Sequence, residues 1–302
     1  MTSYRICVPA SSANLGPAFD SAGIALELYL TLEVEEQSAW EFVHTSDLLP
    51  ACSPYEAHYI YQIAEKTANL YQKPLPPCKA TVTSEIPLAR GLGSSASAVI
   101  AGIELANQQC DLNLTTHDML KLGTAVEGHP DNVAAALLGG MVISTAFEEE
   151  VKHVQLALPE LEAVLSIPSF ELKTEAARNV LPSQFSREMA TMASSISNVF
   201  IAALASGDLE LAGEMMEQDL FHEPYRSSLL PHYEKVRQEA KLAGSLGTVI
   251  SGAGPTMLSF ARKGEGLALA THLQGILPDF QVALTHIAKH GLQTETLRPA
   301  TD

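Results

Sequence analysis

The stretch PLARGLGSSASAVIAG, residues 87–102, places a glycine pair and two serines directly before an alanine-rich segment. Small residues let a backbone approach a ligand closely, and the first N–H groups of a helix carry roughly half a positive charge. Ser94 and Ser95 add hydroxyl groups, one to cap the helix and one to reach a Mg²⁺ ion. The stretch therefore predicts a triphosphate-binding loop that opens a helix. A capped helix with an alanine-rich packing face is the alternative that the stretch alone leaves open.

Two well-known nucleotide loops fit this stretch poorly. Gly91, Gly93 and Ala96 match the dinucleotide fingerprint G-x-G-x-x-[GA], and Asp111 lies 20 residues after Gly91, where a ribose-binding acid is expected. That fingerprint should follow a buried parallel strand, whereas KATVTSEI (79–86) alternates apolar and polar residues, and Asp111 follows a helix. A Walker loop would need a lysine after Gly93. A dinucleotide-dependent oxidoreductase is therefore the less favoured alternative.

The composition is that of a globular protein with room for two domains, because 46% of the 302 residues are hydrophobic and 18% are charged. There are 35 acidic and 18 basic residues, which gives a formal net charge of −17. Such a surface repels nucleic acid and anionic membranes, so we expect neither as a partner. A site for an anionic ligand must supply its own positive potential.

The four cysteines, Cys7, Cys52, Cys78 and Cys110, show neither a CxxC pair nor a Cys/His set at zinc spacing. We expect buried free thiols in a reducing cytoplasm. The N-terminus lacks the apolar segment of a signal peptide. The uncharged run 189–207 carries its larger apolar residues at helical spacing, which predicts a packed amphipathic helix rather than a membrane span. These residues are Met189, Met192, Ile196, Val199 and Phe200.

Strands and helices alternate along the chain in a pattern typical of an α+β fold rather than a doubly wound parallel sheet. Periodicity and capping residues predict strands at 3–9, 27–36, 79–86, 139–144, 161–168, 247–251, 256–261 and 281–288. They predict helices at 55–72, 95–110, from Thr115 or Thr116 onward, and at 186–206, 208–220, 231–246 and 265–277. The acidic segment 147–153 is expected to be a turn at a domain boundary. The predicted domains are 1–155 and 156–302.

Four ordered motifs carry a resemblance to a known family: VPASSANLGPAFDSAGIAL (8–26), PLARGLGSSAS (87–97), EGHPDNVAAALLGG (127–140) and SGAGPT (251–256). Together they resemble the GHMP kinase superfamily and, within it, the homoserine kinases. The resemblance implies a two-domain fold, with a left-handed βαβ unit in the N-terminal half and a ferredoxin-like C-terminal half. It implies phosphorylation of L-homoserine by ATP with Mg²⁺, a step towards threonine, by a cytoplasmic homodimer.

The resemblance also implies the residues of the ATP site. The loop matches the family's ATP-binding segment, which here consists of Pro87, Leu88, Ala89, Arg90, Gly91, Leu92, Gly93, Ser94, Ser95, Ala96 and Ser97. Ser95 and Glu127 match the family's Mg²⁺ ligands, and hard oxygen atoms suit that ion. For Glu127, a solvated acid at a helix end stays open. His58 and Tyr59 stand where members often have an asparagine and an aliphatic residue against adenine, which leaves the purine contacts undecided.

The implied substrate site combines charges of both signs. Asn14, Asp20, His129 and Asp131 match positions that hold the ammonium and hydroxyl groups, and Arg178 and Arg226 match a clamp on the carboxylate. Gly252 and Gly254 match a loop at the cleft. The alternatives are turn formers for Asn14 and Asp20, a polar loop residue for His129, surface arginines, and a plain hairpin turn at the glycines.

Catalysis is expected to rest on positioning and charge neutralisation. Many members of the superfamily have an aspartate base where this chain has Asn132, and an amide cannot accept a proton at neutral pH. A loose transition state needs little prior deprotonation of the nucleophile. Asn132 would orient groups, His129 is the fallback base, and Thr174 either lies near the transferred phosphate or caps a helix. A non-catalytic nucleotide-binding relative is the other alternative, although the metal and clamp residues are all present.

Overall fold

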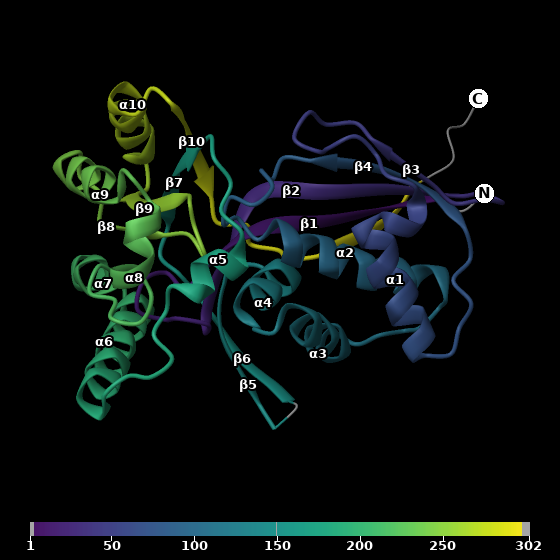
Figure 1. Cartoon of the computed structure of the whole chain (residues 1–302), viewed down its shortest axis with the longest axis horizontal. Helices are drawn as coiled ribbons and strands as arrows, with labels where there is room; N and C mark the ends of the chain where they lie inside the picture. Colours follow the sequence, from purple (N-terminus) through teal and green to yellow (C-terminus); the bar gives the residue numbers. More distant parts are fainter. Residues whose placement is uncertain (1–2, 149, 298–302) are drawn as a thin grey trace.

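The structure is a computed structural model that describes residues 3–148 and 150–297. Its first half is a seven-stranded sheet in which two long antiparallel strands, β1 (Ser3–Ala13) and β2 (Ala22–Glu36), form the centre. Helices α1 to α4 cover one face of this sheet (Figure 1). The other strands are β3 (Glu41–His44), β4 (Cys78–Ser84), β5 (Met141–Phe147), β6 (Glu150–Leu156) and β11 (Gln293–Leu297). The helices are α1 (Tyr59–Leu70), α2 (Ser94–Gln109), α3 (Thr116–Glu127) and α4 (Asp131–Leu138), and a 3₁₀ turn spans Tyr55–Ala57.

The only parallel pair among the described strands of this sheet is β3 with β4, and helix α1 connects the two. The expected βαβ unit is therefore β3–α1–β4, and the left-handedness of its crossover stays a prediction. Strand β4 alternates buried and part-exposed residues, as its sequence predicts. This pattern, and the placement of Asp111 in the turn after α2, give the dinucleotide-binding alternative no support.

The second half is a four-stranded antiparallel sheet with a ferredoxin-like order. Its strands follow one another as β10–β7–β9–β8, with helices between β7 and β8 and between β9 and β10. The strands are β7 (Leu161–Pro168), β8 (Gly247–Ile250), β9 (Met257–Arg262) and β10 (Phe280–His286). The helices are α5 (Thr174–Asn179), α6 (Arg187–Ser206), α7 (Leu209–Met216), α8 (Glu223–Arg226), α9 (Tyr233–Leu242) and α10 (Gly266–Ile276), and a 3₁₀ turn spans Ser227–Leu229. The predicted α+β class and the ferredoxin-like half are confirmed.

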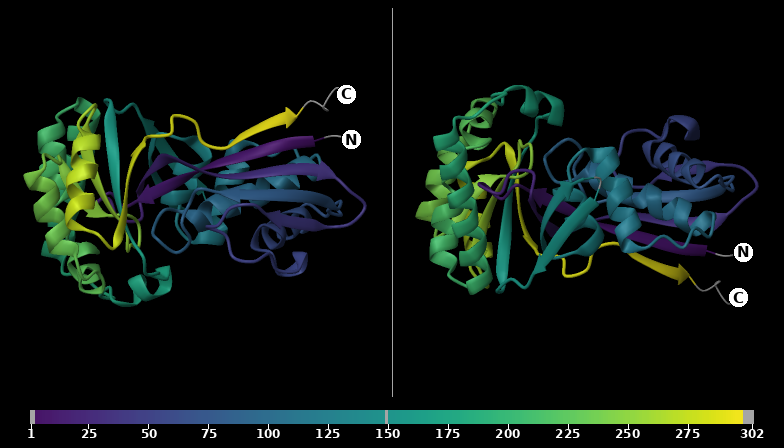
Figure 2. Two further views of the ribbon diagram at one scale, coloured as in Figure 1. Left: turned by 90° about the horizontal axis from the view of Figure 1, so that it is seen from above. Right: turned by 90° about the horizontal axis from the view of Figure 1, so that it is seen from below.

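The last strand returns to the first sheet. β11 pairs with β1 in antiparallel register, with Ser3 opposite Leu297. The chain after β10 runs back along the molecule to reach that edge, so that β1 and β11 lie side by side (Figure 2). The predicted domain boundary between 1–155 and 156–302 stays a prediction. In the structure, the final strand, β11, belongs to the first sheet although it follows the second sheet in the chain.

The predicted turn at 147–153 is wrong for most of its length. Residues 150–153 belong to β6, which forms a hairpin with β5, and Phe147 pairs with Glu150. Val151 is buried, and Lys121 on α3 donates to Glu150 at 2.9 Å. These contacts hold the strand despite the run of acids that suggested a longer turn. Glu149 lies outside the described residues.

The packed face of α6 also differs from the prediction. Its buried residues are Ala193, Phe200, Ala203 and Leu204, whereas Met192 and Val199 are 54% and 42% exposed. The small alanines let the helix approach its neighbours more closely than the larger residues would. By length and composition alone, α6 is the one described helix that could cross a membrane.

All four cysteines are free, as predicted, but they are not all buried. Cys78 and Cys110 are buried, Cys7 is half-buried, and Cys52 is exposed.

Candidate active site

A cavity of about 300 Å³ lies where the two sheets meet, and both halves of the chain line it. Most of the predicted site residues reach it: Asn14, Asp20, Ala89, Gly91, Gly93, Ser94, Ser95, Ala96, Glu127, His129, Asp131, Asn132, Thr174, Arg178, Arg226 and Gly252. Pro87, Leu88, Arg90, Leu92, Ser97 and Gly254 are predicted residues that do not line it. Ala13, Leu172, Lys173 and Ala253 line it although the sequence analysis did not single them out.

The glycine loop opens α2 without a serine cap, so the prediction that a serine caps this helix is wrong. The N-cap is Gly93, in the left-handed region at φ 69°, and no side-chain cap hydrogen bond to the first amides comes from the described residues. A Cβ on Gly93 would lie 2.0 Å from Ser11 Oγ, so the loop packs against β1 only because this residue is glycine. The helix therefore starts with unpaired amides at the cavity wall, which is the arrangement that binds an anion.

Three loop residues predicted to bind ATP make structural side-chain contacts, and their ATP contacts stay a prediction. Arg90 donates to the carbonyl oxygens of Pro168 and Ser169, at 3.1 and 2.7 Å, and so ties the loop to the second sheet. Leu92 is fully buried. Ser97 is also buried, and its hydroxyl donates to the carbonyl of Pro9 at 2.8 Å. Their side chains position the loop and do not face the cavity.

Ser95 and Glu127 meet across the start of α2 and the end of α3. The hydroxyl of Ser95 donates to Glu127 Oε1 at 2.6 Å, and both residues line the cavity. A hydroxyl beside a carboxylate is a pair of hard oxygen donors, and it leaves positions for phosphate and water oxygens. The pair therefore fits a Mg²⁺ ion.

Asp20 and Arg178 form a bidentate ion pair that lines the cavity. Arg178 donates through Nη2 and Nη1 to the two carboxylate oxygens, at 2.7 and 3.2 Å. Both side chains are about a third exposed, so the pair is accessible from the cavity. Phe19 was not singled out from the sequence, although it precedes Asp20. The guanidinium of Arg178 lies over the Phe19 ring, 5.7 Å from the ring centroid, in a cation–π contact.

Arg226 is almost fully buried, which the sequence did not indicate. Its Nε donates to the carbonyl of Ala177 at 3.1 Å, and its Nη1 donates to that of Gly252 at 3.0 Å. Burial, with the nearby charge of Arg178, lowers its pKa to about 10, so it stays a cation. The surface-arginine alternative is thus wrong for Arg226. The residue carries positive potential into the cavity wall and holds α5 against the 251–256 turn.

His129, Asp131 and Asn132 form a connected group before and within the first turn of α4. His129 Nδ1 lies 2.6 Å from Asp131 Oδ1, so it carries a proton and the other ring nitrogen remains for a ligand. Burial alone would lower the pKa of His129, but the hydrogen bond and charge of Asp131 outweigh burial and raise it. Asn132 Oδ1 accepts from Ser11 at 2.9 Å, which orients the amide.

Asn14 acts as a turn former as well as a lining residue. Its Oδ1 accepts from the backbone N–H of Asp20 at 3.0 Å, and its Nδ2 donates to the carbonyl of Gly252 at 2.9 Å. Gly252 and Gly254 have positive φ, 57° and 86°, as predicted for this turn between strands.

Thr174 lines the cavity and is not an N-cap, because Lys173 has that position on α5. The one sequence signal for Lys173 as a cavity residue is its position next to Thr174.

A second cavity of about 410 Å³ adjoins the first at Ser94 and Ser95, which line both. Its walls are mainly apolar and come from the 49–60 segment, β4 and the glycine loop, including Leu49, Tyr59, Ile60, Val82 and Leu88. His58 also lines it, although its ring is stacked on Phe42. An apolar cavity next to the helix start has the right character for a nucleoside, while the charged cavity suits a small polar substrate.

Comparisons with known proteins agree with this geometry. The chain matches the family model for the GHMP kinases N terminal domain over residues 58–140 and that for the GHMP kinases C terminal over 200–275. A homoserine kinase of Oceanobacillus iheyensis is 50% identical over 297 residues, which are 98% of this chain and all of the relative. The solved structure of a candidate homoserine kinase from Listeria monocytogenes is 40% identical with a TM-score of 0.83, over 97% of this chain and 99% of that one. A homoserine kinase structure from Cytophaga hutchinsonii is 26% identical with the same TM-score, over 97% of each chain.

Proposed function

The chain belongs to the GHMP kinase family, and we propose that its site transfers the terminal phosphoryl group of ATP to the hydroxyl group of L-homoserine. The product is O-phospho-L-homoserine, for threonine biosynthesis. The observation that carries this proposal is the pair of cavities that meet at Ser94 and Ser95. One is apolar and the other is lined by charges of both signs, so a nucleotide and a small zwitterion can meet at the start of α2.

The charged cavity offers both halves of a zwitterion site. L-homoserine carries an ammonium and a carboxylate group, and the free site carries Asp20 paired with Arg178. When the substrate enters, its carboxylate takes the guanidinium fork of Arg178 and its ammonium takes the carboxylate of Asp20. This exchange keeps every charge compensated in a protein with a net charge of −17. Arg226 adds positive potential on the carboxylate side from its buried position.

The phosphate side of the site comes from the unpaired amides of α2 and from nearby polar groups. Ser95 and Glu127 would hold Mg²⁺, and a bound Mg²⁺ would neutralise charge on the phosphate oxygens. Lys173 lines the same cavity at the start of α5, beside Thr174. Because the glycine loop lacks a lysine of its own, Lys173 is the cation that we assign to the phosphates.

Catalysis then rests on positioning. Asn132, fixed by Ser11, and His129, fixed by Asp131, orient the substrate hydroxyl toward the phosphate. In its neutral form, His129 accepts a hydrogen bond from that hydroxyl through Nε2 and takes the proton once the new O–P bond has formed. A loose transition state asks for no stronger base. A homodimer and a cytoplasmic location complete the proposal by analogy with the family.

The deciding experiment is a coupled assay of ADP release with ATP and Mg²⁺ over a panel of acceptors. We expect turnover with L-homoserine far above that with mevalonate or galactose. Equal turnover with mevalonate would refute the substrate assignment. Binding of ATP without turnover of any acceptor would favour a non-catalytic relative.

A further inference from the structure

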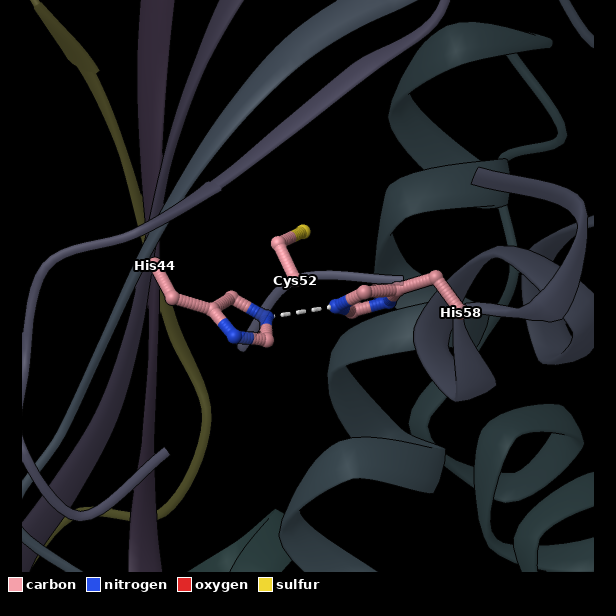
Figure 3. A group of neighbouring side chains, drawn as sticks. All are labelled: His44, Cys52 and His58. Atoms are coloured by element: carbon pink, nitrogen blue, oxygen red, sulfur yellow. Dashed lines mark hydrogen bonds between the residues drawn. The ribbon is translucent and has the colours of Figure 1, made fainter. Parts of the chain in front are cut away.

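A second cluster of chemically active side chains lies away from the charged cavity. His44 ends β3, Cys52 lies in the loop that follows, and His58 directly precedes α1 (Figure 3). One ligand atom from each, a ring nitrogen or the sulfur, lies within 4.8 Å of the other two. The residues are eight and six positions apart, which matches no common zinc spacing, so the spacing alone does not indicate a cluster. The fold brings them together.

His44 is prepared to act as a ligand. Its Nδ1 lies 2.8 Å from the carbonyl oxygen of Pro50, and because a carbonyl only accepts, Nδ1 carries the proton. The lone pair is therefore on Nε2, which points at His58 across 2.9 Å (Figure 3). A backbone carbonyl that fixes the tautomer in this way is the usual support of a metal-bound histidine.

His58 faces His44 from a buried position, and only 7% of the residue is exposed. Its ring stacks on Phe42 with centroids 4.0 Å apart. With His44 Nε2 unprotonated, the short contact requires a proton on His58 Nε2. The Nδ1 of His58 is then a buried acceptor with no partner among the described residues. A metal ion bound at His58 Nε2 would require the ring proton to move from Nε2 to Nδ1, so that the ring stays neutral.

Cys52 supplies the third group. Its thiol is 3.0 Å from the carbonyl oxygen of Phe42 and lies on an exposed loop, so it is accessible to an ion from solvent. Two imidazoles and one thiol form a borderline-soft donor set. Such a set favours Zn²⁺ and its neighbours over Mg²⁺ or Ca²⁺, which prefer oxygen ligands.

We propose that His44, Cys52 and His58 form a binding site for a divalent ion of the zinc class. Bonds of about 2.0–2.1 Å to nitrogen and about 2.3 Å to sulfur put tetrahedral ligand atoms about 3.3–3.6 Å apart. The two nitrogens have to separate slightly from 2.9 Å, and the loop carrying Cys52 has to close. The thiol proton leaves, the proton between the two histidines moves to His58 Nδ1, and a water completes the fourth position.

Such an ion would join β3, the loop and α1 into one wall. The same wall lines the apolar cavity that we assigned to the nucleoside, through His44, Pro50, Ala51 and His58. Where that assignment holds, the metal orders the nucleoside side of the site. The metal site itself does not depend on the kinase assignment, because it is tested without substrate.

The test is a titration of the chelator-treated, full-length protein with Co²⁺ alone, followed by Zn²⁺ competition. We expect one Co²⁺ per chain, with a thiolate-to-cobalt charge-transfer band and the intense visible bands of tetrahedral cobalt, all displaced by Zn²⁺. Cys52→Ser should abolish the charge-transfer band. Cys52→Ser and His44→Gln should each weaken Zn²⁺ binding at least about 100-fold, since losing even an outer-shell partner costs about 10–100-fold.

Matched controls separate this cluster from other metal-binding groups. Cys110→Ser and His153→Gln remove a thiol and an imidazole elsewhere, and both should leave the band and the affinity unchanged. The group Asp20, His129 and Asp131 could also hold an ion, but it contains no sulfur and cannot give the band. No thiolate band in the unmodified protein, or a band that survives in Cys52→Ser, would overturn the proposal.

Discussion

Arg178 holds both carboxylate oxygens of Asp20, at 2.7 and 3.2 Å, across the junction between the two sheets. The two residues are 158 positions apart, and each is the complement of one end of a zwitterion. In the free protein, the two side chains that we propose to bind the substrate are therefore paired with each other. In the proposed function, substrate binding would exchange this ion pair for two pairs with the substrate and leave no charge uncompensated.

Replacing Arg178 should therefore separate substrate affinity from nucleotide affinity. Arg178→Ala is expected to raise the KM for L-homoserine at least about tenfold, about 1.4 kcal/mol, while the KM for ATP stays near its original value. Steady-state kinetics with each substrate varied in turn checks this. Arg187→Ala, an exposed arginine at the start of α6, is the control. An unchanged KM for L-homoserine would remove Arg178 from the carboxylate site.

The pair of Ser95 and Glu127 predicts a specific metal defect. Glu127→Gln keeps the shape of the side chain and removes the charge, so the Mg²⁺ concentration for half-maximal activity should rise at least about tenfold. A Mg²⁺ titration at saturating ATP measures the change. Glu175→Gln, on the exposed side of α5, should leave the titration as it was. If Glu127→Gln behaves like this control, the metal is held elsewhere.

His129 should govern the acid side of the pH profile. Asp131 raises its pKa above 6.5, so the ring becomes a cation as the pH falls through that raised pKa and can no longer accept from the hydroxyl. We therefore expect kcat/KM to decrease as the pH falls through this pKa. His129→Gln keeps a hydrogen-bond acceptor at every pH, so kcat/KM should no longer decrease there, and kcat should be reduced by less than about 100-fold. A loss near 10⁴-fold would instead identify His129 as an indispensable general base.

The buried His222 should make stability depend on pH. Burial lowers its pKa from 6.5 to about 4, so between these values the unfolded chain binds a proton that the native protein does not. The free energy of unfolding must then decrease as the pH falls through this window. Urea unfolding at about pH 7 and about pH 5 should show a smaller decrease in His222→Gln than in the original protein. His153→Gln, an exposed histidine, should keep the full decrease.

The sequence predicted most of the second half and the location of the glycine loop. Strong apolar runs such as 161–168 and capping residues such as Thr115 act locally, so they can be read from a short window. The prediction failed where the partner was distant. β6 looks like an acidic turn until β5 pairs with it, and β11 has a polar pattern that only β1 makes into a strand.

The site residues show the same contrast between features that the local sequence predicts and features that depend on distant partners. The resemblance assigned Asp20, Glu127 and Arg178 to one site, and all three line one cavity, but nothing in the sequence shows that Arg226 is buried or that Arg90 points to the second sheet. Lys173 lacked any signal of its own. Side-chain direction depends on packing between elements far apart in the chain, which local patterns do not encode.

The contact between the two glycine turns gives the last prediction. A Cβ on Gly91 would lie 2.3 Å from the carbonyl oxygen of Ser251 and 2.7 Å from that of Gly254, so a side chain would push the loops apart. Gly91→Ala should raise the KM for ATP and lower the free energy of unfolding by more than the strain alone. Gly128→Ala is the matched control, because its φ is +84° and nothing lies within 4 Å. It should cost only the left-handed strain, about 1–2 kcal/mol, and leave the KM for ATP unchanged. Equal losses in the two variants would mean that the contact between the turns contributes nothing beyond backbone strain.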